Sequence, residues 1–171
     1  FTTRNLKDSE IAYLKSKSNV IPSVFPIGYD GLAFIVNKNN QDTCITVNDI
    51  KRVLTGKATK WSDIVPGSKR GDIEVIFDNT RSATTNWVVD SVLHGEKMGA
   101  KIMAAKTSKQ VIDFVDETPG AIGVIGSNWL NDRRDSTNTT FKKNIHVMRV
   151  SIKDKATPSN SWQPYQAYLL D

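Results

Sequence analysis

The stretch from Asp78 to Thr85 concentrates side chains that could bind a small anion. It reads Asp-Asn-Thr-Arg-Ser-Ala-Thr-Thr and lies between a run typical of a strand and a run typical of a helix. Free backbone N–H groups and the positive end of the helix dipole point into such a turn. Ser82 and Thr84 add hydroxyl donors, and Arg81 adds a permanent cation whose fork of N–H groups suits oxyanions. The sequence therefore indicates an oxyanion cradle.

Two other interpretations of Ser82 are open. It can simply cap the helix that follows, which is the commoner role of a serine at such a turn. It can also act as the nucleophile of a hydrolase, but a serine hydroxyl needs an adjacent base, and neither His94 nor His146 lies in a recognisable partner motif. No P-loop pattern and no G-x-G-x-x-G is present, so nucleotide binding has no motif support. We therefore expect a binding protein without catalytic residues.

The composition excludes several classes of protein and site. The 171 residues include 23 Lys and Arg against 18 Asp and Glu, which gives a net charge of +5 and favours anionic partners without requiring them. No apolar run reaches the roughly 18 residues that a membrane span needs. Cys44 is the only cysteine, so an intrachain disulfide is excluded, and with two histidines the sequence offers no basis for a metal site. We expect neither a metal nor a cofactor.

A basic stretch raises the question of nucleic acid. Lysines and arginines recur at positions 51, 52, 57, 60, 69 and 70, interleaved with helix and turn signals. Aromatic stacking partners are missing apart from Trp61, which we expect to be a packing residue. A solvated basic face is therefore the better interpretation, and no nucleic-acid partner is expected.

Short apolar runs alternate with capped helical stretches, a pattern typical of α/β layers. Strands are expected over 32–36, 73–77, 101–105, 121–125 and 145–150. Helices are expected after four cap residues, namely Asp8, Thr46, Ser82 and Thr107. The first helix should present Ile11 and Leu14, and the third should bury Val88 and Val92, with Trp87 as a further candidate. The anion cradle thus lies where a buried strand passes into a helix.

Four segments, in this order, resemble one known family. Residues 3–6 read T-R-N-L and are followed by Glu10; residues 29–37 read Y-D-G-L-A-F-I-V-N. Residues 50–57 read I-K-R-V-L-T-G-K and run on to W-S-D-I at 61–64, and residues 119–123 read P-G-A-I-G after a helical stretch. Together they are similar to the phosphate-binding protein of the ABC-type phosphate importer, a two-lobed extracytoplasmic solute-binding protein. The resemblance spans nearly the whole chain.

The resemblance implies a fold and a domain plan. The fold is a periplasmic-binding-protein-like lobe in three layers, with a central mixed sheet and helices on both faces. Residues 1–171 form a single, partial solute-binding domain, an excised middle portion of the family's length. Residues 29–152 are mainly the second lobe, and residues 1–28 and 153–171 are remnants of the first. Gly56, Trp61, Gly120 and Ile122 are expected to be structural signatures of this lobe rather than ligand contacts.

The resemblance also assigns site residues. In the family the second-lobe anion loop reads R-S-x-x-S-G-T, and Ser82-Ala83-Thr84 matches its end. Asp78 stands where the arginine would be and Asn79 where the first serine would be, while Arg81 falls inside the loop. The ligand-binding residues expected on this basis are Ser82, Thr84, Arg81, Asn79, Thr3 and Arg4, the last two on the opposite wall.

Function and partners follow from the same resemblance. It implies a monomeric protein outside the cytoplasmic membrane, periplasmic or in the cell envelope and lipid-anchored through a lost cysteine. The protein would capture inorganic phosphate or a similar oxyanion and hand it to an ABC permease. The main alternative is a sensory or adhesion module that keeps the fold without transport, and Asp78 in the cleft favours this alternative. The chain begins at Phe1 without a signal peptide, so we expect that it has been processed or cut.

Overall fold

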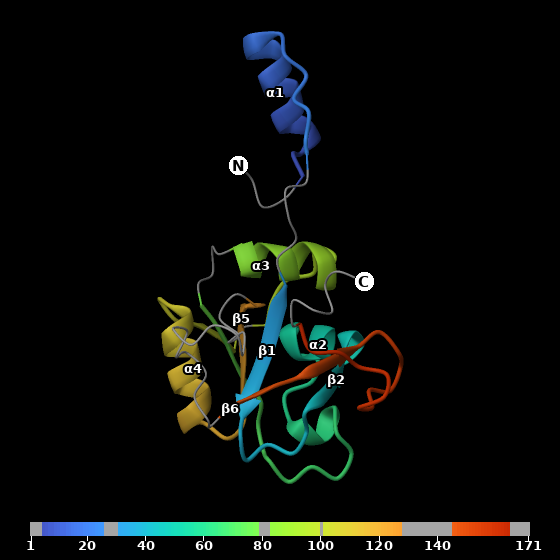
Figure 1. Ribbon diagram of the computed structural model, residues 1–171, viewed down its shortest axis with the longest axis vertical. Coiled ribbons are helices and arrows are strands. Elements are labelled where there is room, and N and C mark those ends of the chain that lie inside the picture. Colours follow the sequence, from blue (N-terminus) through green and yellow to red (C-terminus); the bar gives the residue numbers. More distant parts are fainter. Residues whose placement is uncertain (1–4, 26–30, 79–82, 100, 128–144, 165–171) are drawn as a thin grey trace, which may run out of the picture.

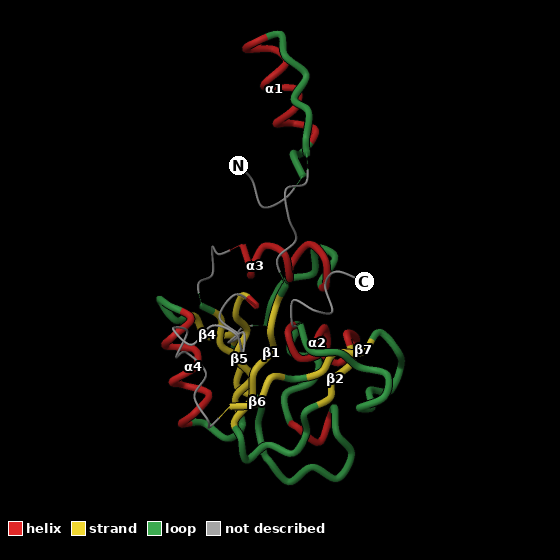
Figure 2. The backbone as a smooth tube through the Cα atoms, viewed as in Figure 1, coloured by secondary structure: helices red, strands yellow, loops and turns green. Residues whose placement is uncertain are grey.

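The computed structural model describes residues 5–25, 31–78, 83–99, 101–127 and 145–164. Figures 1 and 2 show a body in which helices cover a central sheet, and a first helix, α1, that stands apart from it. Within the described residues, no helix is both long and apolar enough to cross a bilayer. Sites of α/β proteins commonly lie at the ends of the sheet strands, and these strands belong to the body.

The body is built on a mixed sheet. Its described strands lie in the order β4-β3-β5-β1-β6, and β1 runs antiparallel to both of its neighbours whereas β3, β4 and β5 are parallel. This confirms the mixed sheet that the resemblance implied. The strands are β1 (Leu32–Asn37), β3 (Glu74–Phe77), β4 (Ile102–Ala104), β5 (Ala121–Gly126) and β6 (Ile145–Val147).

Each face of the sheet carries its own hydrophobic core. Side chains alternate along β1, so that Phe34 and Val36 belong to one core and Ala33 and Ile35 to the other. Helix α2 (Val47–Leu54) contributes to the first core, and helix α4 (Ser108–Glu117) contributes to the second. Since both faces are covered, the central strands are apolar on both sides, as expected for the run at 32–36. The three-layer prediction is confirmed.

Helix α2 begins and ends where the sequence predicted. The Thr46 hydroxyl accepts a hydrogen bond from the Asp49 N–H at 2.9 Å, and Gly56 follows the C-cap with a φ of 76°, which glycine adopts without strain. Thr46 also ends a short strand, β2 (Cys44–Thr46), which the sequence analysis missed. Three residues that run directly into a helix cap carry too short a pattern to be recognised as a strand.

The prediction of a single strand over 145–150 was wrong. The chain instead forms β6 in the main sheet and then β7 (Arg149–Ser151), which pairs with β2 in a separate two-stranded sheet. Met148 lies between them, fully buried, and its N–H donates to the Phe34 carbonyl. A continuous alternating run thus changes sheets at a buried residue, which periodicity alone does not reveal.

Helix α3 (Ala83–Trp87) continues into a π-helical turn, η2 (Val88–Val92). Val88 and Val92 are buried as predicted, but Trp87 is 49% exposed, so its expected burial was wrong. Val88 and Val92 are four residues apart and share a face of the helix, whereas Trp87 precedes Val88 by one residue and points elsewhere. The segment packs on the first core through the two valines.

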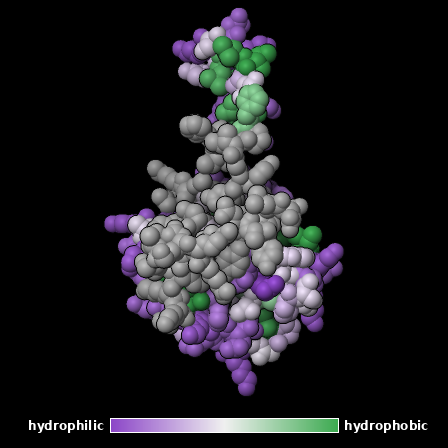
Figure 3. Space-filling model, viewed as in Figure 1, coloured by the Kyte–Doolittle hydropathy of each residue, from purple (hydrophilic) through white to green (hydrophobic). Residues whose placement is uncertain are grey.

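Helix α1 (Asp8–Ser18) buries none of its residues. Asp8 does not cap it; Lys7 is the N-cap, and its backbone N–H donates to the Glu10 carboxylate at 2.8 Å. The expected cap was wrong because the helix begins one residue earlier than predicted: Asp8 is its first residue, and the Glu10 carboxylate pairs with the N–H of the cap residue Lys7. Leu14 is exposed, and Figure 3 shows apolar side chains at the surface of this part of the molecule. Other exposed apolar residues here are Tyr13, Val20, Ile21, Val24 and Phe25.

Candidate functional site

The candidate site lies at the edge of the sheet where its parallel strands end. Because β3, β4 and β5 are parallel and β1 is antiparallel to β5, three carboxyl ends and the start of β1 meet there. Ser127 follows β5, its N–H donates to the Gly31 carbonyl at 2.7 Å, and its hydroxyl accepts from the Gly31 N–H at 3.2 Å. Ligand sites of α/β proteins commonly occupy this position. The edge brings polar residues from distant parts of the sequence together.

Asp78 follows β3 at this edge and contacts the start of α4. Thr107 caps α4 by accepting from the Gln110 N–H, and the Gln110 side chain in turn accepts from the Lys106 N–H at 2.9 Å. Ser108, buried in the first turn, donates its hydroxyl to Asp78 Oδ2 at 3.2 Å. Asp78 Oδ1 is shielded from solvent, and no donor of the described residues lies within hydrogen-bonding distance of it. An unsatisfied buried acceptor costs about 1–3 kcal/mol.

Of the six predicted ligand-binding residues, Thr84 is the one that lies within the described residues. It lies at the start of α3, 9% exposed, and its neighbour Thr85 is 7% exposed. Helix α3 contacts β5, so these hydroxyl-bearing residues lie over the same sheet as Asp78. The other predicted residues, Thr3, Arg4, Asn79, Arg81 and Ser82, lie outside the described residues. Their assignment stays a prediction.

The residues expected to be structural are structural. Trp61 opens a short 3₁₀ helix, η1 (Trp61–Asp63), and is completely buried in the first core, where its indole N–H donates to the Gly120 carbonyl at 3.0 Å. Ile122 is buried beside it in the same core. A Cβ at Gly120 would lie 2.6 Å from the Asp72 carbonyl oxygen, so only glycine fits. These residues join the segments around η1 and β5.

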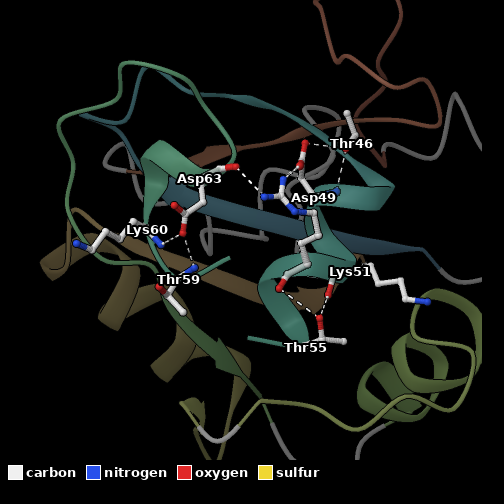
Figure 4. A network of polar contacts seen from close by, with 8 residues as sticks. Thr46, Asp49, Lys51, Thr55, Thr59, Lys60 and Asp63 are labelled. Carbon is white, nitrogen blue, oxygen red and sulfur yellow. Dashed lines mark hydrogen bonds and ion pairs between the residues drawn. The ribbon is translucent and has the colours of Figure 1, made fainter. Parts of the chain in front are cut away.

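A network of polar contacts fixes α2 to η1 (Figure 4). Arg52 donates to the Asp49 carboxylate at 2.9 Å and to the Asp63 carbonyl at 3.1 Å. The Asp63 carboxylate accepts from the N–H groups of Lys60 and Thr59, each at 2.9 Å. These two hydrogen bonds, the one from Lys60 first, hold the pKa of Asp63 below its usual value. The W-S-D-I motif is therefore a capped turn anchored to a helix.

The basic stretch is largely paired with acids. The Glu96 carboxylate contacts Lys51 at 2.6 Å and Lys57 at 3.1 Å, and these hydrogen bonds, the one from Lys51 first, lower the pKa of Glu96. Arg70 pairs with Asp42 at 3.2 Å. Because contacts with the backbone phosphates of a nucleic acid need free cations, these ion pairs support the interpretation of the basic stretch as a solvated face.

A shallow surface hollow lies at the opposite end of the sheet. It is lined by Asp42, Ser68, Lys69 and Arg70. Asp42 lies beyond the carboxyl end of β1 and Arg70 precedes β3, so the hollow is remote from the edge that carries Asp78. The Asp42–Arg70 ion pair cancels most of its charge. Across the residues that the structure describes, no group of three or more His, Cys, Asp and Glu is placed to hold a metal ion.

Solved structures with this fold come from several phosphate-binding proteins. A possible phosphate binding protein from Planctomyces limnophilus superposes with a TM-score of 0.69 at 23% identity, covering 97% of this chain and 56% of that one. A protein from Clostridium perfringens solved with bound phosphate gives a TM-score of 0.57 at 27% identity, covering 78% and 50%. An ABC-type phosphate transport receptor from Vibrio cholerae gives 0.64 at 19% identity, covering 93% and 58%. The fold is that of a periplasmic-binding-protein-like lobe.

Curated relatives agree with the structural neighbours. The phosphate-binding protein PstS of Staphylococcus epidermidis is 25% identical over 134 residues, which are 78% of this chain and 40% of that protein. PstS of Bacillus subtilis is 28% identical over 102 residues, covering 60% and 33%. The chain therefore spans less than half the length of these relatives. A family profile described as the PBP superfamily domain matches residues 1–168, and the chain belongs to that superfamily.

Proposed function

We propose that this protein is a solute-binding protein that captures inorganic phosphate, or a related oxyanion, for an ABC transporter. The observation that carries the proposal is the edge of the sheet after β3, where Asp78 contacts the start of α4 and where α3 also begins. The chain belongs to the PBP superfamily, which supports the proposal. The relatives named above are phosphate-binding proteins, which supports the same ligand class. The reaction class is capture and release, so no residue is assigned a catalytic role.

The binding energy would come from hydroxyl and backbone donors in a desolvated cleft. Thr84, buried at the start of α3, is the described donor. Ser82 and Asn79 would add donors from the same loop, and Arg81 would supply the countercharge. The remaining two predicted residues, Thr3 and Arg4, would close the site from the other wall when the lobes meet.

The domain plan is part of the proposal. Residues 29–152 would belong mainly to the second lobe, and residues 1–28 and 153–171 would be remnants of the first lobe. Helix α1 supports this plan because it buries no residue, and the apolar residues that follow it, such as Ile21 and Phe25, are exposed at 70% and 78%. Apolar surface of this extent normally packs against something. The remainder of the first lobe would cover it.

The site residue is tested by calorimetric titration. Phosphate, sulfate and molybdate are titrated into the polypeptide in the full length that its source expresses, and into Thr84→Val and Thr43→Val. Thr43 directly precedes β2 of the separate two-stranded sheet and is the matched control. We expect tight binding of phosphate that Thr84→Val weakens about tenfold or more, the usual effect of one lost hydrogen bond to a charged group, whereas Thr43→Val leaves it unchanged. Absence of binding for every anion would refute the proposal.

The same titration tests the alternative function, a module that keeps the fold without transport. A carboxylate at Asp78, where the family carries an arginine, favours a sensory or adhesion module that keeps the fold without transport. Such a module would bind none of the three anions. A location outside the cytoplasmic membrane, a lipid anchor and an ABC permease as partner belong to the transport proposal, and co-purification of the permease from detergent-solubilised membranes tests them. Turnover of a phosphate ester that is lost in Ser82→Ala would instead establish a hydrolase.

A further inference from the structure

The helix that follows β3 changes its winding part-way along. Residues 83–87 form the α-helical part, α3, and residues 88–92 form the π-helical turn, η2. The Leu93 N–H donates to the Val88 carbonyl at 3.0 Å, a hydrogen bond that spans five residues where an α-helix spans four. Turns of this kind are rare and often lie at functional sites. The extra residue lets the two ends of the segment pack independently.

The burial of Leu93 accounts for the π turn. Val88, Val92 and Leu93 are buried in the first core, at 0%, 7% and 0% exposed. In an α-helix each residue turns by about 100°, so a residue five positions further on points about 140° away. An α-helical connection would therefore take either Val88 or Leu93 out of the core. The π turn keeps both buried, while Asp90 and Ser91 between them stay exposed.

The same sequence also fits a continuous α-helix that turns a different face inward. Val89 follows Val88 and is already partly buried against the first core. One face of an α-helix holds residues i, i+4, i+7 and i+8, and this spacing selects Thr85, Val89, Val92 and Leu93. In that arrangement Val89 takes the place of Val88 in the core, a valine for a valine.

We propose that residues 83–89 form a register switch between these two windings. In the π register, Thr84 and Val88 face inward. In the α register, this part of the helix turns by about 100° and advances by about 1.5 Å, so that Thr85 and Val89 take their places. Each exchange replaces a residue by an identical one, so the two packings differ little in free energy. The later part of the segment stays in the core in both registers and is its fixed end.

The switch exists with or without an anion, but its coupling to the site rests on the proposed function. Thr84 is the described donor of that site, and the α register presents Thr85 in its place. A bound oxyanion that accepts from Thr84 favours the π register, because it binds that register more tightly than the other. Thr84 and Thr85 thus occupy one position of the site in turn.

Asparagine substitutions in the first core test the switch without any ligand. Val88→Asn buries an amide in the π register, and the α register relieves this cost because it buries Val89 instead. Val92 faces the core in both registers, so Val92→Asn has no such relief and is the matched control. Val88 is the more deeply buried of the two, so burial alone predicts the larger loss for Val88→Asn. The switch predicts the reverse order.

Thermal unfolding measures the loss in each variant. Val88→Asn and Val89→Asn should each lower the Tm by about 2–4 °C, and Val92→Asn should lower it by more than either. The double variant with asparagine at both 88 and 89 should lose more than the sum of the two single losses, because neither register then has a valine for the core. A loss for Val88→Asn as large as that for Val92→Asn, or additive losses in the double variant, would overturn the switch. Where Val88→Asn and Val92→Asn both fail to fold, the corresponding alanine variants decide by the same comparison.

Titration of inorganic phosphate into the same variants separates the switch from the proposed function. The polypeptide is used in the full length that its source expresses. Val88→Asn should bind phosphate about tenfold or more weakly, the effect of losing the hydrogen bond from Thr84, whereas Val89→Asn should bind it as the unmodified protein does. Equal affinities of these two variants would overturn the coupling. If no protein binds phosphate but the losses in Tm follow the predicted order, the function is wrong and the switch stands; if phosphate binds and the losses follow burial, the reverse holds.

Discussion

Substituting Gly123 by alanine tests how closely α4 packs against the sheet. Gly123 lies in β5, opposite Ile35 of β1. A Cβ there would come within 2.7 Å of Val111 Cγ1, and within 2.8 Å of Ile35 Cγ1 and of Val115 Cγ2. Overpacking of this kind costs about 1–3 kcal/mol, and the stiffer unfolded chain returns about 0.4–1 kcal/mol. Taking the middle of both ranges, we expect a net loss of about 1–2 kcal/mol, or a fall in Tm of roughly 2–8 °C.

Urea unfolding followed by circular dichroism measures this loss, and a double-mutant cycle assigns it to the clash. Val111→Ala alone should also destabilise, because it leaves a cavity. In the double variant the alanine at 123 fills part of that cavity, so the two effects should be smaller together than their sum by about 0.5–3 kcal/mol. Additive effects, or a Gly123→Ala variant as stable as the original protein, would refute the packing argument.

Three further predictions follow from the first core and the polar network. Trp61→Phe should cost about 1–3 kcal/mol, because it leaves the Gly120 carbonyl without the indole N–H, and urea unfolding measures it. Asp63 has a lowered pKa in the folded state, so its contribution to stability is complete above its ordinary pKa and is lost as the pH falls through the lowered value. Unfolding curves between pH 7 and about 2 should therefore show a smaller acid-induced loss for Asp63→Asn than for the unmodified protein. Glu96→Gln should produce only a small destabilisation that vanishes in molar salt, since Lys51, Lys57 and Glu96 are at the surface, and thermal unfolding at two salt concentrations checks it.

The fold could be predicted where local signals and burial agree. The strand at 32–36, the caps at Thr46 and Thr107, and the turn at Gly56 each combine an apolar period with a specific end signal. The prediction was wrong where tertiary packing decides. Residues 145–150 alternate as one strand should, but the burial of Met148 divides them between two sheets. Sequence periodicity records which side chains are buried and says nothing about which sheet buries them.

The candidate site was only partly predictable for the same reason. A strand followed by hydroxyl residues and a helix indicated the turn at 78–85, because those signals are local. The contact of Asp78 with Ser108 joins residues 30 positions apart, and it depends on β3 and β4 being parallel neighbours. The capping residue Thr107 did mark where a second helix begins, so the signal that could have found Ser108 was its place in the first turn of that helix.

The motifs that reveal the family do little to reveal its ligand, and the structure shows why. Trp61, Gly120 and Gly123 are recognisable because the fold leaves no room for other residues: one fills the first core, and a Cβ at either glycine would collide with its neighbours. Their presence therefore reports packing. Ligand choice would depend instead on the proposed site at the edge after β3, where Asp78 contacts Ser108 of α4. A relative can share every packing residue and still select a different oxyanion, so the anion affinities of Thr84→Val and of the unmodified protein carry more information about function than overall similarity does.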